Sequence, residues 1–380
     1  MLQKSVNSQK ESVGIYLHIP FCKQKCNYCD FCSSPSFIDK ADEYTDALLK
    51  EIDTYKSADK IYVDSVFFGG GTPSILPSEQ FIKIVEKLNE IFFIGNDAEI
   101  TLEANPKTLT AEKLEVYKKC GVNRLSIGMQ TIHENELKKL GRIHNFEDFL
   151  TSFRIARNAG FDNINIDLMY GIPEQTVESF KKTLETVISL SPEHISCYGL
   201  IIEENTPFYE LKGTLNLPKE NDELDMYDAC VNELSIAGYR HYEISNYSKE
   251  GYICRHNMKY WTLDEYIGFG ISAHSFYNGR RYYNKSDFGE YISSNCLNYR
   301  QNETDFIGID YNEYIMLRLR ISDGIVFREF KDIFGFDFRA GREELLKRYV
   351  EAGYAVYSDN SFFLTDKGFY LSNAIISTLI

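Results

Sequence analysis

The 380-residue sequence lacks the features of a membrane or secreted protein. It contains no run of about 18 apolar residues, so we expect no segment to cross a bilayer as an apolar helix. Residues 1–12 are polar and lack the apolar core of a secretory signal peptide. Internal repeats and low-complexity tracts are also missing. These absences predict a globular cytoplasmic protein without stable membrane insertion.

Positive charge is scarce. The chain has 41 Lys and Arg against 56 Asp and Glu, which gives a net charge of −15. Nucleic acids and anionic membrane surfaces attract proteins in which Lys and Arg are clustered. We therefore expect no nucleic-acid partner.

The nine cysteines do not suit a disulfide framework, because their number is odd and five of them are scattered. The remaining four lie together between residues 22 and 32. We expect the scattered cysteines to be reduced packing residues. They are Cys120, Cys197, Cys230, Cys254 and Cys296.

The crowded cysteines predict a metal centre. Cys22, Cys26 and Cys29 stand in a C-x3-C-x2-C spacing, and sulfur ligands select iron–sulfur clusters or zinc. Three ligands leave one iron of a 4Fe-4S cluster open to a small molecule. Cys32 extends the motif, so a closed four-cysteine site, with zinc or an electron-carrying cluster, is the alternative. The sequence has no second cysteine run of the ferredoxin kind, which favours the open cluster with Cys32 as a bystander.

Helices and strands alternate along the first 200 residues, and this rhythm predicts parallel strands in a barrel or a doubly wound sheet. After an apolar run that begins at Ile15, we expect strands at 64–68, 98–103, 124–129, 163–168 and 194–199. The expected helices are at 39–55, 77–91, 110–119, 134–139, 146–158 and 177–190.

A different pattern follows. We expect a helix at 220–236 and a strand at 241–247. From about Asp310, three helical segments, a hairpin at 354–364 and a helix at 365–375 suggest a small winged-helix-like module. Acidic residues outnumber basic ones in this module, so we interpret it as a lid or partner surface and not as a DNA-binding unit.

Unusual polar residues follow successive strands of the predicted sheet. The cysteine loop, residues 69–72, Glu103, Gln130 and Asp167 all come at or just after the carboxyl end of a strand. In parallel α/β folds these ends meet at one rim, where binding sites are built. The pattern therefore predicts that these residues face one cavity.

Two of these features also have structural explanations. The glycines at 69–71 let the backbone approach a ligand closely, but they equally suit a tight turn, and they do not match a phosphate-binding loop. Glu103 ends an apolar run and needs a partner, and Arg142 could form a structural ion pair with it.

The cysteine motif resembles the cluster loop of the radical S-adenosylmethionine (SAM) superfamily. Its flanks at 16–21 and 28–31 are similar to the oxygen-independent coproporphyrinogen III oxidase-like (HemN/HemW) family, as are the segments 121–130 and 167–173. The resemblance extends from about Gly14 to the C-terminus. It implies an α/β fold, a radical SAM partial (β/α)6 TIM-like barrel with a C-terminal helical, winged-helix-like domain. We expect a polar tail at 1–12, the barrel and its extension at 13–290, and a HemN-type C-terminal domain at 291–380.

The resemblance also implies cofactors. Cys22, Cys26 and Cys29 would bind a 4Fe-4S cluster whose open iron chelates SAM. His256 lies in a His-Asn-x-x-Tyr-Trp segment that resembles one associated with heme in the family, although a lone histidine is usually a packing residue. Cys254 is a weaker candidate for a heme ligand. Residues that match SAM-binding positions are Tyr16, Tyr28, Gly70, Gly71, Thr72, Glu103, Gln130, Arg142 and Asp167.

The sequence differs from the oxidases of this family at two points, and both differences favour the heme-binding members. The oxidases have a longer arm before the cluster loop, whereas Cys22 here follows only 21 residues, and they have a further cysteine where this chain has Phe31. We therefore expect a heme chaperone. Its partners would be heme, an unidentified heme-acceptor protein and a flavodoxin-like or ferredoxin-like reductant. The alternative is a radical SAM enzyme that acts on a porphyrin, or a related methyltransferase.

Overall fold

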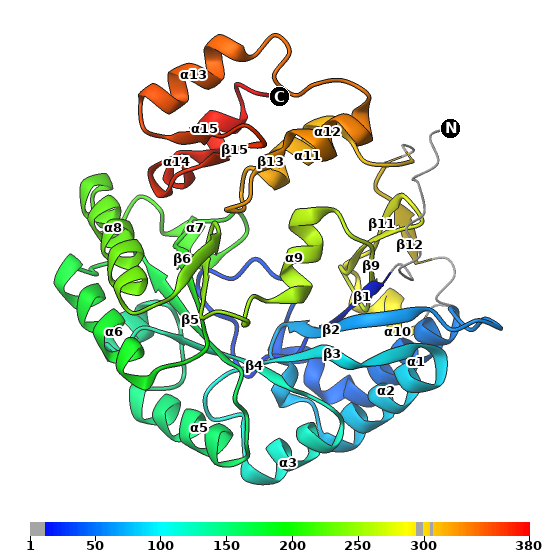
Figure 1. Ribbon diagram of the computed structural model, residues 1–380. Helices are drawn as coiled ribbons and strands as arrows, with labels where there is room; N and C mark the ends of the chain where they lie inside the picture. The colour runs from blue at the N-terminus through cyan, green and yellow to red at the C-terminus, as the bar shows by residue number, and fades with distance from the viewer. Residues whose placement is uncertain (1–11, 294–298, 305–306) are drawn as a thin grey trace.

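The computed structural model describes residues 12–293, 299–304 and 307–380 (Figure 1). Within these residues twelve strands form one sheet, in the order β12-β11-β10-β9-β1-β2-β3-β4-β5-β6-β8-β7. The edge strands β12 and β7 do not pair with each other in this part of the chain, so the barrel is open. The first six strands are parallel and follow chain order, which confirms the predicted partial (β/α)6 barrel. They are β1 (Val13–Ile19), β2 (Tyr62–Gly70), β3 (Phe93–Ala104), β4 (Arg124–Gln130), β5 (Ile164–Tyr170) and β6 (His194–Gly199).

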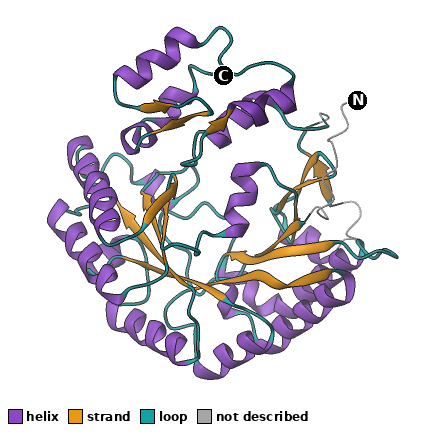
Figure 2. Ribbon diagram, viewed as in Figure 1, coloured by secondary structure: helices purple, strands orange, loops and turns teal. Residues whose placement is uncertain are grey.

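Helices cover the outer face of the curved sheet (Figure 2). They pack through apolar residues at helical spacing, as Phe81, Ile84 and Leu88 do in α2. Capping boxes at Asn145 and Thr176 satisfy the first backbone N–H groups of α5 and α6. The outer helices are α1 (Ala41–Asp53), α2 (Ser78–Ile91), α3 (Ala111–Lys119), α5 (Phe146–Asn158), α6 (Val177–Leu190) and α8 (Glu220–Ile236). Short helices at the loops are η1 (Pro35–Lys40), η2 (Pro73–Ile75), α4 (Glu134–Lys139) and α7 (Pro207–Glu210).

The segment after α8 differs from its prediction. The single strand predicted at 241–247 is wrong, because the chain reverses at Ile244 and Ser245 and forms a hairpin of β7 (Arg240–Glu243) and β8 (Asn246–Ser248) against β6. Helix α9 (Arg255–Thr262) then lies on the concave side of the sheet (Figure 1). Strand β9 (Tyr266–Phe269) pairs in parallel with β1. The sheet continues with antiparallel β10 (His274–Tyr277), β11 (Arg280–Asn284) and β12 (Arg300–Asn302), and α10 (Phe288–Ser293) lies between the last two in sequence.

The C-terminal module crosses the open side of the barrel (Figure 1), and its core extends to Leu263, Tyr266 and Phe276 of the large sheet's extension. The predicted hairpin is present, but the helix predicted at 365–375 is divided into two at Leu371. Contacts to the barrel include His241 Nδ1 with Asp366 Oδ1 at 2.6 Å and Tyr227 Oη with the Asp366 carbonyl at 2.9 Å. The elements are α11 (Tyr311–Arg318), β13 (Ile325–Val326), α12 (Phe327–Phe334), α13 (Glu343–Glu351), β14 (Ala355–Tyr357), β15 (Ser361–Leu364), α14 (Asp366–Tyr370) and α15 (Ser372–Ile376).

The predicted domain limits stay predictions. Strand β12 pairs with β11, so the large sheet continues past residue 290. Of the predicted tail at 1–12, only Ser12 is described, and Cys296 also lies outside the described residues. None of the helices among the described residues combines the length and the apolar composition that a membrane span requires.

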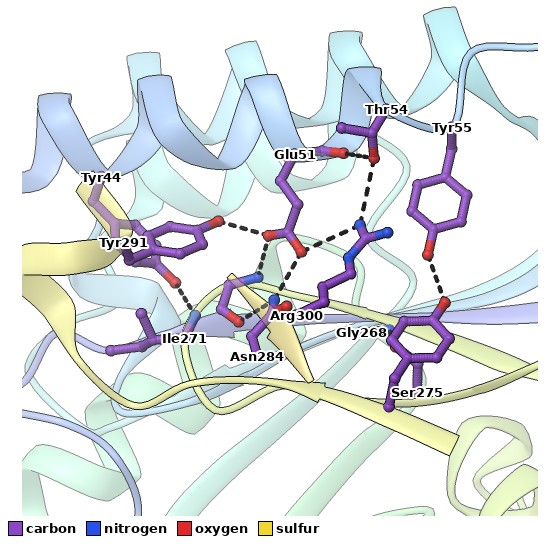
Figure 3. Close-up of polar contacts among 12 residues, drawn as sticks. Tyr44, Glu51, Thr54, Tyr55, Gly268, Ile271, Ser275, Asn284, Tyr291 and Arg300 are labelled. Carbon is purple, nitrogen blue, oxygen red and sulfur yellow. Dashed lines mark hydrogen bonds and ion pairs between the residues drawn. The ribbon is translucent and has the colours of Figure 1, made fainter. Parts of the chain in front are cut away.

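A buried carboxylate joins α1 to the extension of the sheet (Figure 3). Glu51 is 1% exposed and accepts hydrogen bonds from the backbone N–H of Gly270 at 2.9 Å, from Asn284 Nδ2 at 2.7 Å and from Tyr291 Oη at 2.7 Å. Arg300 Nη2 lies 3.5 Å from the same carboxylate. Segments more than 200 residues apart in the sequence therefore meet at one side chain.

The same region supports the end of β1. Tyr44, also on α1, donates from its hydroxyl to the carbonyl oxygen of His18 at 2.6 Å and accepts from the backbone N–H of Ile271. The His18 ring in turn lies between Tyr16 Oη, at 3.1 Å, and the carbonyl oxygen of Cys32, at 2.7 Å. Hydrogen bonds thus hold the backbone near both ends of the cysteine loop, at His18 and at Cys32.

Candidate functional site

A cavity of about 320 Å³ lies at the carboxyl ends of the parallel strands. Its volume is in the range of small-molecule binding sites. Tyr16 and His256 are not part of its wall. The predicted site residues that line it are Cys22, Cys26, Cys29, Tyr28, Gly70, Gly71, Thr72, Glu103, Gln130, Arg142 and Asp167.

The cysteine loop is held against the end of α4. The backbone N–H of Asn27 donates to the Leu140 carbonyl at 3.0 Å, and its side-chain amide donates to the Lys139 carbonyl at 2.8 Å. Gln24 Nε2 donates to the carbonyl of Gly141 at 2.9 Å. These bonds order a loop that has no regular secondary structure of its own between residues 22 and 33.

Three thiols of the loop face the cavity and the fourth does not. Burial raises the pKa of Cys29, and the neighbouring thiols of Cys26 and Cys22 raise it further. A cationic metal centre would reverse this effect, because it favours thiolates. The Cys32 thiol instead donates to the carbonyl oxygen of Ser286 at 3.5 Å. Among the described residues, no three His, Cys, Asp or Glu side chains form a group that could hold a single metal ion.

The glycine stretch packs tightly against the start of the cysteine loop. The N–H groups of Gly71 and Thr72 donate to the carbonyls of Ile19 and Phe21 at 2.9 and 2.7 Å. A Cβ atom at Gly71 would lie 2.7 Å from the Phe21 carbonyl oxygen. Gly70 has a φ of +107°, and a Cβ atom there would lie 2.7 Å from the His18 ring. Gly71 therefore needs glycine because another backbone segment packs closely against it, whereas Gly70 needs it for its left-handed conformation and for the nearby His18 ring.

Glu103 and Arg142 do not form the ion pair considered from the sequence. Glu103 Oε2 accepts from the backbone N–H of Gly70 at 3.2 Å, and Arg142 Nη1 donates to Asn105 Oδ1 at 2.8 Å. Arg142 Nε is buried without a partner. The cavity thus presents a carboxyl group and a guanidinium that are not paired with each other and that keep atoms free for a ligand. Such a pair is complementary to the ammonium and carboxylate groups of an amino acid.

Desolvation raises the pKa of Glu103 to about 8, and the negative charge of Asp167 contributes to the rise. The fold therefore favours the protonated form, so the free energy of unfolding without ligand should fall as the pH rises from about 5 to 8. We expect the free energy of unfolding of Glu103→Gln, measured by urea denaturation, to depend less steeply on pH across that range. The difference in slope should correspond to about one proton fewer released on unfolding. Glu147→Gln, at an exposed glutamate on α5, is the control, and equal pH slopes in wild type and Glu103→Gln would contradict the prediction.

The far wall of the cavity consists of β4 and β5. Asp167 accepts hydrogen bonds from Asn165 Nδ2 at 2.7 Å and Ser126 Oγ at 3.2 Å, while burial raises its pKa. Gln130 has a φ of +70° and follows a shift in register against β5. This left-handed conformation costs a non-glycine residue about 1–3 kcal/mol, and such strain clusters at functional sites. A Cβ atom at Gly128 would lie 2.9 Å from Arg142 Nη2, so the small residue leaves room for the guanidinium.

Tyr16 and His256 lie together in the interior of the barrel, where their rings stack with centroids 6.4 Å apart. His256 is 1% exposed and burial lowers its pKa to about 3. Its Nδ1 is 3.0 Å from Ser65 Oγ and its Nε2 is 2.8 Å from Tyr260 Oη. Both ring nitrogens are therefore occupied by hydrogen bonds. A role of His256 as a heme ligand stays a prediction.

Sequence reasoning missed Asn105, although it lies two residues after Glu103 and lines the same cavity. The alternation of side chains along an extended segment could have identified it. It also missed Ser126 and Asn165, which hold Asp167. Their inward positions on β4 and β5 become evident only once the strands are paired.

Comparisons with known proteins agree with this architecture. Residues 16–187 match the radical SAM superfamily, and residues 310–371 match the HemN C-terminal domain. The heme chaperone HemW of Bacillus subtilis is 37% identical over 96% of this chain and 98% of its own length. HemW of Haemophilus influenzae is 32% identical over 97% of this chain and 98% of its own.

A solved structure shares the fold. Coproporphyrinogen III oxidase (HemN) from Escherichia coli, a radical SAM enzyme, superposes with a TM-score of 0.83 at 24% identity, covering 97% of this chain and 90% of the other. Membership of the radical SAM superfamily implies a 4Fe-4S cluster and SAM. This chain belongs to the HemW family of radical SAM proteins.

Proposed function

We propose that this protein binds a SAM-coordinating 4Fe-4S cluster and heme, and that it delivers the heme to an acceptor protein. The observation that carries the proposal is the convergence on one cavity of three thiols with a glutamate and an arginine that have no ion-pair partner there, in a chain of the HemW family. Relatives that match almost the full chain are named heme chaperone HemW.

Cys22, Cys26 and Cys29 would hold the cluster. A 4Fe-4S cluster held by these three thiols would supply one-electron chemistry to SAM in the cavity. Glu103 would receive the ammonium group of SAM and Arg142 its carboxylate. The residues proposed to surround SAM are Tyr16, Tyr28, Gly70, Gly71, Thr72, Glu103, Gln130, Arg142 and Asp167.

The remaining chain groups would shape the SAM site. Gly70 and Gly71 would let the backbone approach the ligand. Asp167, held by Asn165 and Ser126, and Gln130, fixed by its left-handed backbone, would offer polar atoms from the opposite wall. Tyr16 lies outside the cavity wall and would act through His18, because its hydroxyl lies 3.1 Å from His18 Nδ1 and the His18 ring lies beside Gly70.

His256 is the proposed heme ligand, and ligation through Nε2 would replace its hydrogen bond with Tyr260. We expect His256→Ala to weaken heme binding and to shift the Soret band in an anaerobic heme titration. His274→Ala is the matched control, because that histidine is exposed on β10. A Soret band and affinity unchanged in His256→Ala would place the ligand elsewhere, with Cys254 as the next candidate.

The function is tested by comparing two reactions of the anaerobically reconstituted protein. In one, heme is added and the Soret band is followed. In the other, coproporphyrinogen III, SAM and a flavodoxin-like or ferredoxin-like reductant are added and the product is measured. Heme binding without product supports the chaperone, whereas product formed at enzymatic turnover contradicts it. The heme-acceptor protein and the cytoplasmic location stay predictions.

A further inference from the structure

Three hydrogen bonds connect Arg142 to the first cysteine of the loop. Arg142 Nη1 lies 2.8 Å from Asn105 Oδ1, and Asn105 Nδ2 lies 2.8 Å from Thr72 Oγ1. Thr72 Oγ1 lies 3.8 Å from Cys22 Sγ. All four residues line the cavity, and Cys22 is 8% exposed.

The direction of these bonds follows from the chemistry of the groups. A guanidinium only donates, so the amide oxygen of Asn105 must face Arg142 and its NH₂ group must face Thr72. Thr72 Oγ1 therefore accepts from Asn105 and keeps its own hydrogen for another acceptor. That acceptor is Cys22 Sγ. The amide thus determines where the hydroxyl proton of Thr72 points.

We propose that Asn105 is a positioning residue that directs the Thr72 hydroxyl at the Cys22 sulfur and thereby raises the reduction potential of a cluster bound to that sulfur. The inference rests on the proposed function, because it requires Cys22 to be a cluster ligand. Reduction adds negative charge to the cluster, and a hydrogen bond to a ligand sulfur stabilises that charge. Groups that orient a ligand in this way commonly tune a metal centre.

Two substitutions of similar shape, Thr72→Val and Asn105→Asp, test this chain of hydrogen bonds, and Thr72→Ser is the control. Thr72→Val removes the hydroxyl, whereas Thr72→Ser keeps it. Asn105→Asp keeps the size of the side chain, but a carboxylate only accepts hydrogen bonds, so it would draw the Thr72 proton away from Cys22. The readout is the midpoint potential of the reconstituted cluster without SAM, obtained by redox titration followed by electron paramagnetic resonance, together with iron content.

We expect Thr72→Val and Asn105→Asp to shift the potential to more negative values with unchanged iron content, and Thr72→Ser to leave it near that of the wild type. The charge added by Asn105→Asp also lowers the potential, so the decisive comparison is the double variant. In the Thr72→Val background the shift caused by Asn105→Asp should be smaller, because the hydroxyl it acts on is gone.

Either of two results would overturn the inference: a wild-type potential in Thr72→Val, or an equally large shift from Asn105→Asp in both backgrounds. Loss of iron in Asn105→Asp, with a wild-type potential for the clusters that remain, would also overturn it. That pattern would mean that Asn105 maintains the structure of the loop without tuning the cluster. These failures differ from a failure of the proposed function, in which the wild-type protein itself would bind no cluster.

Discussion

Replacement of Cys29 by alanine should abolish cluster binding, whereas replacement of Cys32 should leave it intact. Cys29 shares the cavity wall with Cys22 and Cys26, so its removal leaves only two of three thiolates. The Cys32 thiol is turned away and donates to a carbonyl oxygen. We expect the iron bound after anaerobic reconstitution to fall by more than roughly tenfold in Cys29→Ala, because losing even an outer partner of a ligand commonly costs tenfold or more in metal affinity.

Iron and sulfide analysis measures this difference, and Cys32→Ala is its matched control within the same loop. Equal iron loss in both variants would indicate a closed four-cysteine site and would contradict the open cluster. Electron paramagnetic resonance with and without SAM gives an independent check. The spectrum of the reduced wild-type cluster should change when SAM is added, because one iron would be open to it.

The location of the site was predictable because strand ends in a parallel sheet share one edge. Glu103, Gln130 and Asp167 each follow a buried apolar strand, and the structure brings them to one cavity with the cysteine loop. Helices α2 and α6 were equally predictable, since each has a strong apolar face. Local periodicity identifies the strands and helices, and the rule for parallel sheets then places the site at the strand ends.

Elements that depend on distant partners were not predictable. Strand β9 has only four residues and owes its place to pairing with β1, more than 250 residues earlier in the chain. The β7–β8 hairpin is too short for an alternating pattern to reveal its reversal.

Side-chain partners were equally hidden. Arg142 was a natural partner for Glu103 on charge alone, yet the structure gives it Asn105. The interior position of Tyr16 and His256 likewise follows from where α9 packs, which periodicity cannot specify.

Among substitutions on α1, we expect that of the buried Glu51 to cause the largest loss of stability. Glu51→Ala removes the acceptor of Gly270, Asn284 and Tyr291 and leaves Arg300 without its carboxylate partner (Figure 3). Breaking a buried pair by removing one member typically costs about 3–5 kcal/mol, because the remaining polar groups stay desolvated. We therefore expect the free energy of unfolding in urea to fall by that amount.

Glu43→Ala, at an exposed position of the same helix, controls for helix propensity and should change the free energy of unfolding by no more than about 0.5 kcal/mol. Glu51→Gln keeps the shape but replaces one acceptor oxygen with a donor, so its loss should lie between the two. The Tyr44 ring packs against that of Tyr291, with centroids 5.1 Å apart, and its hydroxyl donates to the His18 carbonyl. We therefore expect the cysteine loop to loosen as well, so that Glu51→Ala binds less iron than Glu43→Ala. Equal stability and equal iron content in these two variants would mean that the buried network does not support the metal-binding loop.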